Sequence, residues 1–214
     1  MEVFKDLTIR GSEDALQDFI EAIMGNVPRG WSRDESRENE LKKVALDSED
    51  HQYAFSRESF DGTPGATLFM IQDGETLRFT NIVPHDVGSL TRGQYNALID
   101  DFVDHLVEPV IAGIDVTYEV TAAQVGMTHW LSEEAVGRLE RFSSTANKGT
   151  GSSHPRDFER WASFLIQAHS EGSSLDAETL QRWLIEEKGW PAETADELAI
   201  QYEFARNLLG AYDR

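Results

Sequence analysis

The sequence contains no cysteine among its 214 residues. Disulfide bonds, thiolate nucleophiles and cysteine-ligated metals are therefore excluded, and the absence fits a reducing compartment. Long apolar runs are missing as well, since no stretch approaches the roughly 20 residues that a membrane-spanning helix needs. The amino terminus has no basic segment leading into an apolar one, so we expect no secretory signal. Together these features predict a cytoplasmic protein that does not contact a membrane.

Positive charge is scarce. The chain has 19 basic and 39 acidic residues, which gives a formal net charge of −20, and only five of the bases are lysine. Such a surface repels phosphate backbones, so we expect no direct binding to nucleic acid. The acidity has two open explanations: solubility, including life in salt, or attraction to a basic protein partner.

Reaction motifs are also missing. The sequence has no HExxH zinc motif, no phosphate-binding loop, no glycine set of a dinucleotide-binding fold and no Gly-x-Ser-x-Gly elbow. We therefore expect no cofactor, and the sequence does not favour an enzyme.

The first part of the chain mixes strand and helix signals. Strands are predicted at residues 7–10, in either or both of 43–49 and 52–59, on both sides of a turn at Asp73–Gly74, and at 113–122. Helices are predicted at 12–25, capped by Ser12, and at 90–110, where Thr91 and Gln94 form a capping box. The polar stretch 29–43 is interpreted as an exposed loop or a frayed edge.

Residues from 129 onward carry only helical signals. Four helices are expected, beginning near Ser132, Pro155, Asp176 and Pro191. The fold class is therefore α+β: an antiparallel sheet of four to five strands with two helices, ferredoxin-like or a split sandwich, followed by an all-helical segment. We expect an α+β part at 1–128 and a helical part at 129–214, packed as one compact unit because the junction is short and apolar.

The segment 143–154 connects two of these helices and is almost free of apolar side chains. Glycines, hydroxyls and basic groups before a helix can hold a phosphate or carboxylate, because the helix presents free N–H groups there. The candidate anion-binding residues are Asn147, Lys148, Thr150, Ser152, Ser153, His154 and Arg156. The alternative is an ordinary inter-helix loop, with Ser153 or His154 as the cap of the next helix and no ligand.

A second candidate lies in the acidic helix at 100–108. Asp101 and His105 are four residues apart and Asp104 follows the same acidic side, so these three could contribute to a metal site. A further ligand from elsewhere in the chain would be needed. The alternative is the solvated polar face that any amphipathic helix presents.

Tryptophans gather in the helical part, where Trp161, Trp183 and Trp190 lie among Phe158 and several leucines. We interpret them as core; an aromatic pocket beside the 143–154 segment is the alternative. Two functional hypotheses follow. The first is a non-catalytic acidic protein that neutralises or escorts a basic partner, as immunity proteins and antitoxins do. The second is a small-anion-binding protein, or an enzyme of unassigned class, that uses residues 147–156.

Overall fold

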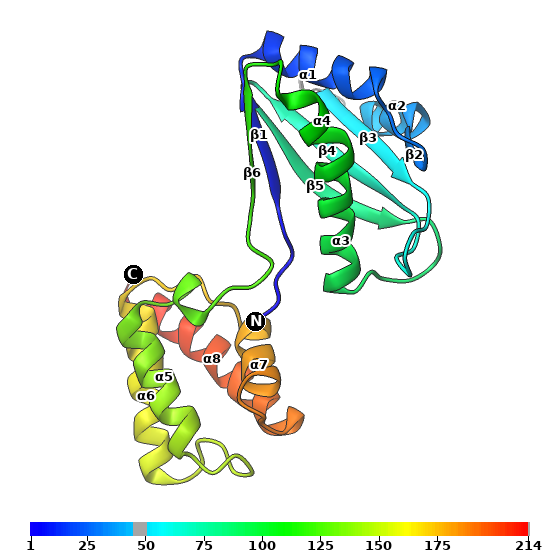
Figure 1. Cartoon of the computed structure of the whole chain (residues 1–214). Helices are drawn as coiled ribbons and strands as arrows, with labels where there is room; N and C mark the ends of the chain where they lie inside the picture. The colour runs from blue at the N-terminus through cyan, green and yellow to red at the C-terminus, as the bar shows by residue number, and fades with distance from the viewer. Residues whose placement is uncertain (45–50, 214) are drawn as a thin grey trace. The chain divides into compact units, whose positions relative to one another are not determined.

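The protein divides into two compact units, seen in a computed structural model that describes residues 1–44 and 51–213 (Figure 1). One unit, here called the sheet unit, holds Glu2–Ala123. The other, the helical unit, holds Met1 together with Gln124–Arg214. Each unit has its own hydrophobic core. The chain passes from the sheet unit to the helical unit between Ala123 and Gln124. The predicted parts at 1–128 and 129–214, and their packing as one compact unit, stay predictions.

The sheet unit is an α+β fold whose antiparallel sheet curls into a half-barrel. Within the described residues the sheet has six strands in the order β2-β3-β4-β5-β1-β6, one more than the upper end of the predicted range. The strands are β1 (Leu7–Gly11), β2 (Trp31–Arg33), β3 (His51–Arg57), β4 (Ala66–Asp73), β5 (Thr76–Pro84) and β6 (Val116–Val120). The predicted α+β class and the helical carboxyl-terminal region are confirmed.

Helices α1 (Glu13–Gly25) and α3 (Arg92–Phe102) supply much of the core of this unit. Both predicted caps are present: Ser12 accepts from the Ala15 N–H at 3.2 Å, and Thr91 and Gln94 form a capping box. After α3 the chain continues through a π-helical turn (Val103–Val107) into α4 (Glu108–Ile111). Pro109 lies in α4, and its missing N–H fits this local widening of the helix.

Residues 29–43 are not an exposed loop, although β2 is an edge strand of the sheet. This stretch forms β2 and helix α2 (Glu35–Val44), and Trp31 is buried. Two interactions explain the order: β2 pairs with β3, and the Arg33 guanidinium makes hydrogen bonds of 2.7–3.1 Å to the buried carboxylate of Glu38, five residues further along the chain. The strand pairing joins residues 22 to 26 positions apart, and no local pattern gives it.

The predicted hairpin is confirmed, but its turn is shifted by one residue. Asp73 pairs with Thr76, so Gly74 and Glu75 form the two-residue loop. Gly74 takes the positive φ of 55° that such a turn requires. Of the two candidate strands before the hairpin, the second is β3; residues 45–49 of the first lie outside the described residues.

The helical unit has the four predicted helices: α5 (Glu133–Thr145), α6 (Pro155–Ser170), α7 (Ala177–Glu186) and α8 (Ala192–Tyr212). A short 3₁₀ turn (Met127–His129) precedes them. The tryptophans at 161, 183 and 190 are buried in the core, as interpreted, but Phe158 is 58% exposed. Among the described helices, none is long and apolar enough to cross a bilayer.

Candidate binding site

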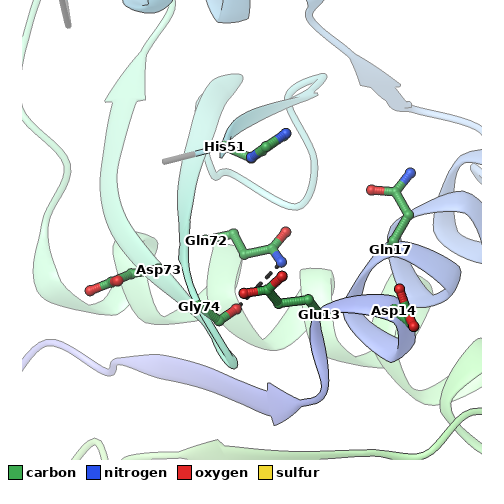
Figure 2. Close-up of a pocket in the computed structure, with 7 residues that line it drawn as sticks. All are labelled: Glu13, Asp14, Gln17, His51, Gln72, Asp73 and Gly74. Atoms are coloured by element: carbon green, nitrogen blue, oxygen red, sulfur yellow. Dashed lines mark hydrogen bonds between the residues drawn. The ribbon is translucent and has the colours of Figure 1, made fainter. Parts of the chain in front are cut away.

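An acidic hollow lies where the start of α1 meets the β4–β5 turn (Figure 2). Its volume is about 550 Å³. The acidic hollow is lined by Glu13, Asp14, Gln17, His51, Gln72, Asp73 and Gly74. Figure 2 shows the Glu13 side chain extending from the helix into the space beside Gln72 and Gly74.

Strand pairing brings these residues together from three separate segments. β1 pairs with β5 up to Arg10 and Thr76, and the Gly11 N–H donates to the Glu75 carbonyl at 3.1 Å, so α1 begins beside the turn. The Ser12 cap then places Glu13 and Asp14 in the first helical turn. The third segment arrives through β3, where His51 is opposite Gln72.

The chemistry of the acidic hollow is anionic. Three carboxylates line it, and among the described residues neither a lysine nor an arginine does. A second hollow, of about 410 Å³, lies on the other side of Ser12 and the turn; it adds Glu75 and Asp115, together with one arginine, Arg10. Carboxylates around an open, water-filled space attract an ammonium or guanidinium group, which can donate several hydrogen bonds at once.

This hollow was not predicted from the sequence. Local patterns account for each carboxylate by itself: Glu13 and Asp14 lie in the first turn of α1, where the helix dipole favours acidic residues, and Asp73 flanks the β4–β5 turn. The grouping depends on β1 pairing with β5, which joins residues nearly 70 positions apart in the chain. No motif marks such a grouping, and only the strand order could have suggested it.

The predicted anion loop is ordered by its own hydrogen bonds. Asn147 is the centre: its carbonyl accepts from the N–H groups of Thr150 and Gly151, and its side chain accepts from Gly149 at 2.9 Å. Lys148 donates to the Lys188 carbonyl at the end of α7. These contacts show a loop fixed against the helical unit rather than an open arm.

The structure brings only some of the candidate anion ligands together. Five line one shallow depression of about 860 Å³, along with Arg160: Asn147, Thr150, Ser153, His154 and Arg156. Lys148 and Ser152 do not line it, and the Ser152 hydroxyl donates to the Gln201 side chain of α8 at 2.8 Å.

The first turn of α6 is capped by its own residues. His154 Nδ1 accepts from the Arg156 N–H at 3.3 Å, so His154 is the cap. The next two N–H groups, of Asp157 and Phe158, donate to the His154 carbonyl. The Asp157 carboxylate is itself buried there and pairs with Arg160 at 2.7 Å. An incoming anion would therefore meet satisfied N–H groups and a carboxylate, which is less favourable than the free helix terminus assumed from sequence.

The candidate metal residues lie in a different arrangement from the one expected. Asp101 is buried rather than on the solvated face, and its Oδ2 accepts from Trp31 Nε1 at 2.8 Å and from Arg57 Nε at 2.7 Å. His105 Nδ1 is 3.2 Å from Asp101 Oδ1, while Asp104 is exposed. No group of three or more His, Asp or Glu suited to a metal ion occurs in the described part of the chain. The Asp101 carboxylate instead ties α3 to the sheet.

Acidic side chains on the exposed side of this helical segment raise the pKa of Tyr118 on β6. Tyr118 Oη donates to Glu108 Oε1 at 3.0 Å. The pKa of Tyr118 is raised, first by that hydrogen bond and further by the negative charges of Glu108 and Asp104. The local potential is thus negative here too.

Comparison with known proteins gives one partial match. Residues 133–206, about a third of the chain, are similar to a family described as a domain of unknown function, DUF1889. That region runs from the start of α5 into the second half of α8. Searches of the curated proteins and of the solved structures find no match.

Proposed function

We propose that the protein is a non-catalytic acidic interaction protein that neutralises or escorts a basic protein partner, in the manner of an immunity protein or antitoxin. The observation that carries this proposal is the acidic hollow, which presents three carboxylates without a lysine or arginine among the described residues that line it. The sheet unit as a whole has 24 acidic and ten basic residues, so the hollow lies in a strongly negative surrounding.

Such a surface acts mainly on association. A negative field attracts a basic partner before contact and raises the association rate, and carboxylates at the contact then select against acidic competitors. Salt screens this attraction, with a Debye length of about 10 Å at 0.1 M ionic strength. The proposal therefore requires binding that weakens steeply as salt is added.

The test uses a short, fluorescein-labelled, arginine-rich peptide as the probe. The variant Glu13→Gln/Asp14→Asn/Asp73→Asn removes the three carboxylates of the hollow while keeping similar side-chain shapes. The control Asp18→Asn/Glu58→Gln/Asp86→Asn removes three exposed carboxylates elsewhere in the sheet unit, so both proteins have the same net charge. We expect anisotropy titrations at low salt to show a loss of about tenfold in affinity for the hollow variant, about 1.4 kcal/mol. Equal losses in the two variants would contradict a site at the hollow.

A second candidate function is the binding of phosphate or a small carboxylate by residues 147–156, either in a binding protein or in an enzyme of unassigned class. Its support is the depression that gathers Ser153, His154 and Arg156 next to Arg160. The test is a thermal-shift titration with inorganic phosphate against matched chloride. A saturable rise in the melting temperature that is lost in Arg156→Ala but kept in Lys148→Ala would establish a site at the depression. If phosphate does not change the melting temperature, the segment is a structural loop without a ligand.

We also infer a more specific fold for the centre of the sheet unit. Strands β4, β5, β1 and β6 are neighbours in that order, all antiparallel, and helices α1 and α3 contribute to one core. This order supports a ferredoxin-like centre to which β2, α2 and β3 are added. A solution structure of residues 2–123 with the two helices on opposite faces of the sheet would refute it.

A further inference from the structure

Helix α8 exposes a regular row of large apolar side chains. Ile200, Phe204, Leu208 and Tyr212 follow one another at intervals of four residues and are 60%, 66%, 56% and 86% exposed. Residues four apart lie on the same face of a helix, so these side chains form one continuous row. Scattered exposed apolar residues are ordinary, but a continuous patch is typical of an interaction surface.

The opposite face of α8 already anchors the helix. Ala195, Leu198 and Tyr202 are buried in the core of the helical unit, and Tyr202 donates to the Leu175 carbonyl at 2.9 Å. The exposed row therefore does not serve the folding of this unit. Its exposure is a cost that a partner would relieve, at roughly 25 cal/mol for each Å² of apolar surface covered.

Helix α6 packs against α8 and exposes apolar side chains of its own. Two hydrogen bonds tie α8 to the segment around α6: Ser152 Oγ to Gln201, and His169 Nε2 to Asp213 at 2.7 Å. Exposed apolar side chains on α6 are Phe158 and Ile166, each 58% exposed.

Charge indicates what would cover the row. Towards the start of α8 the same side of the helix continues through Glu197 and Glu193, three and seven residues before Ile200, and Asp196 lies four residues before it; all three are exposed. The ionisable side chains that extend the row in this direction are therefore all acidic. A complementary helix would have an apolar stripe to cover Ile200–Tyr212 and lysine or arginine to meet the two glutamates.

We propose that this surface of α8, formed by Glu193, Glu197, Ile200, Phe204, Leu208 and Tyr212, docks an amphipathic basic helix of the protein partner. The inference rests on the proposed function, because it takes the partner to be basic. A second copy of this chain would bring no positive charge to Glu193 and Glu197 from its own row. An anionic membrane surface would repel both residues.

The probe for the experiment is a synthetic peptide of about 18 residues, five helical turns, with leucine along one face and lysine and arginine elsewhere. A scrambled peptide of the same composition has the same charge but no apolar face. Both are titrated against the full chain by fluorescence anisotropy. We expect the amphipathic peptide to bind at least about tenfold more tightly than the scrambled one.

Two surface variants locate the binding. Phe204→Ser/Leu208→Ser is expected to weaken binding about tenfold, and Glu193→Gln/Glu197→Gln about fivefold with a smaller salt dependence. The matched controls are Val87→Ser, a fully exposed apolar side chain in the sheet unit, and Glu133→Gln/Glu178→Gln, two exposed glutamates of the helical unit on helices other than α8. Both controls are expected to bind as the unaltered protein does, and circular dichroism verifies that every variant is folded.

Each other outcome overturns the inference in a recognisable way. If the amphipathic peptide binds no better than the scrambled one, or binds Phe204→Ser/Leu208→Ser normally, the row is not the docking surface; retained binding of the arginine-rich peptide then leaves the proposed function standing. If neither peptide nor the arginine-rich probe binds, the proposed function fails too. If the unaltered protein sediments as a dimer that Phe204→Ser/Leu208→Ser converts to a monomer, the row is covered by a second copy instead.

Discussion

At the scale of single residues, Gly151 shows how tightly the 143–154 segment is held. It has a φ of 58°, and a Cβ added there would lie 3.1 Å from Thr194 Cγ2 on α8. We expect Gly151→Ala to lower the free energy of unfolding of the helical unit by about 1 to 2 kcal/mol, the cost of a left-handed backbone for alanine.

The matched control is Gly149→Ala, where the nearest contact of an added Cβ is Asn147 Oδ1 at 3.4 Å. Urea unfolding followed by tryptophan fluorescence reports mainly on the helical unit, because four of the five tryptophans lie there. A smaller cost for Gly151→Ala than for Gly149→Ala would contradict the description of the segment as ordered against α8.

Two buried tryptophans differ in a single hydrogen bond. Trp190 Nε1 donates to the buried hydroxyl of Ser143 at 2.8 Å, whereas Trp161 Nε1 is buried without a hydrogen-bond partner in the described residues. Replacing either residue by phenylalanine removes the same atoms, but only Trp190→Phe leaves Ser143 without its donor. We expect Trp190→Phe to cost about 1 to 2 kcal/mol more than Trp161→Phe in urea unfolding. Equal costs would mean that the Trp190 hydrogen bond contributes nothing.

Local capping was the part of the structure most accessible from sequence. Ser12, Thr91, Ser132 and Asp176 each accept a backbone N–H in the turn that follows, and that interaction depends only on residues three apart. The loop residues were harder. Their types suit an anion, but the Lys148 and Ser152 side chains bind α7 and α8, whose positions no local pattern gives.

At the scale of secondary-structure elements, β2 and α2 depend on one ion pair. Glu38 is 3% exposed, and besides Arg33 it accepts the Ala54 N–H of β3 at 3.1 Å. Arg33→Met would leave this carboxylate buried without its counter-charge, so we expect a loss of about 3 kcal/mol. Chemical denaturation followed by circular dichroism measures it.

The control for this pair is Arg37→Met on the same helix. Arg37 and Glu40 are both more than half exposed and 3.7 Å apart, and such surface pairs contribute about 0 to 1 kcal/mol. If both variants lose the same stability, the buried pair is not what holds α2 to the sheet.

The contact of α3 with the sheet predicts a pH dependence. Burial, with a smaller contribution from Asp6, raises the pKa of Tyr95 to about 12. The neutral phenol is thus favoured in the folded state, while in the unfolded chain it ionises near pH 10. Its contribution to stability is complete below about pH 10 and is lost as pH rises towards about 12.

Tyr95→Phe removes this titration, so its unfolding free energy is expected to fall less between pH 9 and 11 than that of the unaltered protein. Denaturant unfolding followed by circular dichroism at several pH values measures the slope, and Tyr212→Phe, at an 86% exposed position of the helical unit, is the control. An unchanged slope in Tyr95→Phe would contradict the effect of burial.

At the scale of the whole molecule, the sequence pattern predicted the fold class but not the full strand order. Alternating and helical patterns gave an α+β part followed by four helices, and both are confirmed. The full six-stranded order was not predicted, because the edge strand β2 lies in the polar stretch 29–43, for which no strand was expected. The acidic hollow was missed because it joins residues from three separate segments of the chain.

Charge is the property of the whole molecule on which the account of function depends. The net charge of −20 is spread over both units. The acidic hollow and the exposed α8 row are the two surfaces at which we expect a basic partner to bind. If acidity served solubility alone, a basic probe would bind weakly and without preference for either place.

The most direct test of this account is the salt dependence of binding to the arginine-rich peptide. Association rates and affinities are measured for the unaltered protein between about 0.05 and 0.3 M salt, where the Debye length shortens from roughly 14 to 6 Å. The account predicts a fall of at least about tenfold in affinity, mostly through the association rate, and a shallower fall for Glu13→Gln/Asp14→Asn/Asp73→Asn. No binding at the lowest salt, or binding that salt does not change, would contradict it.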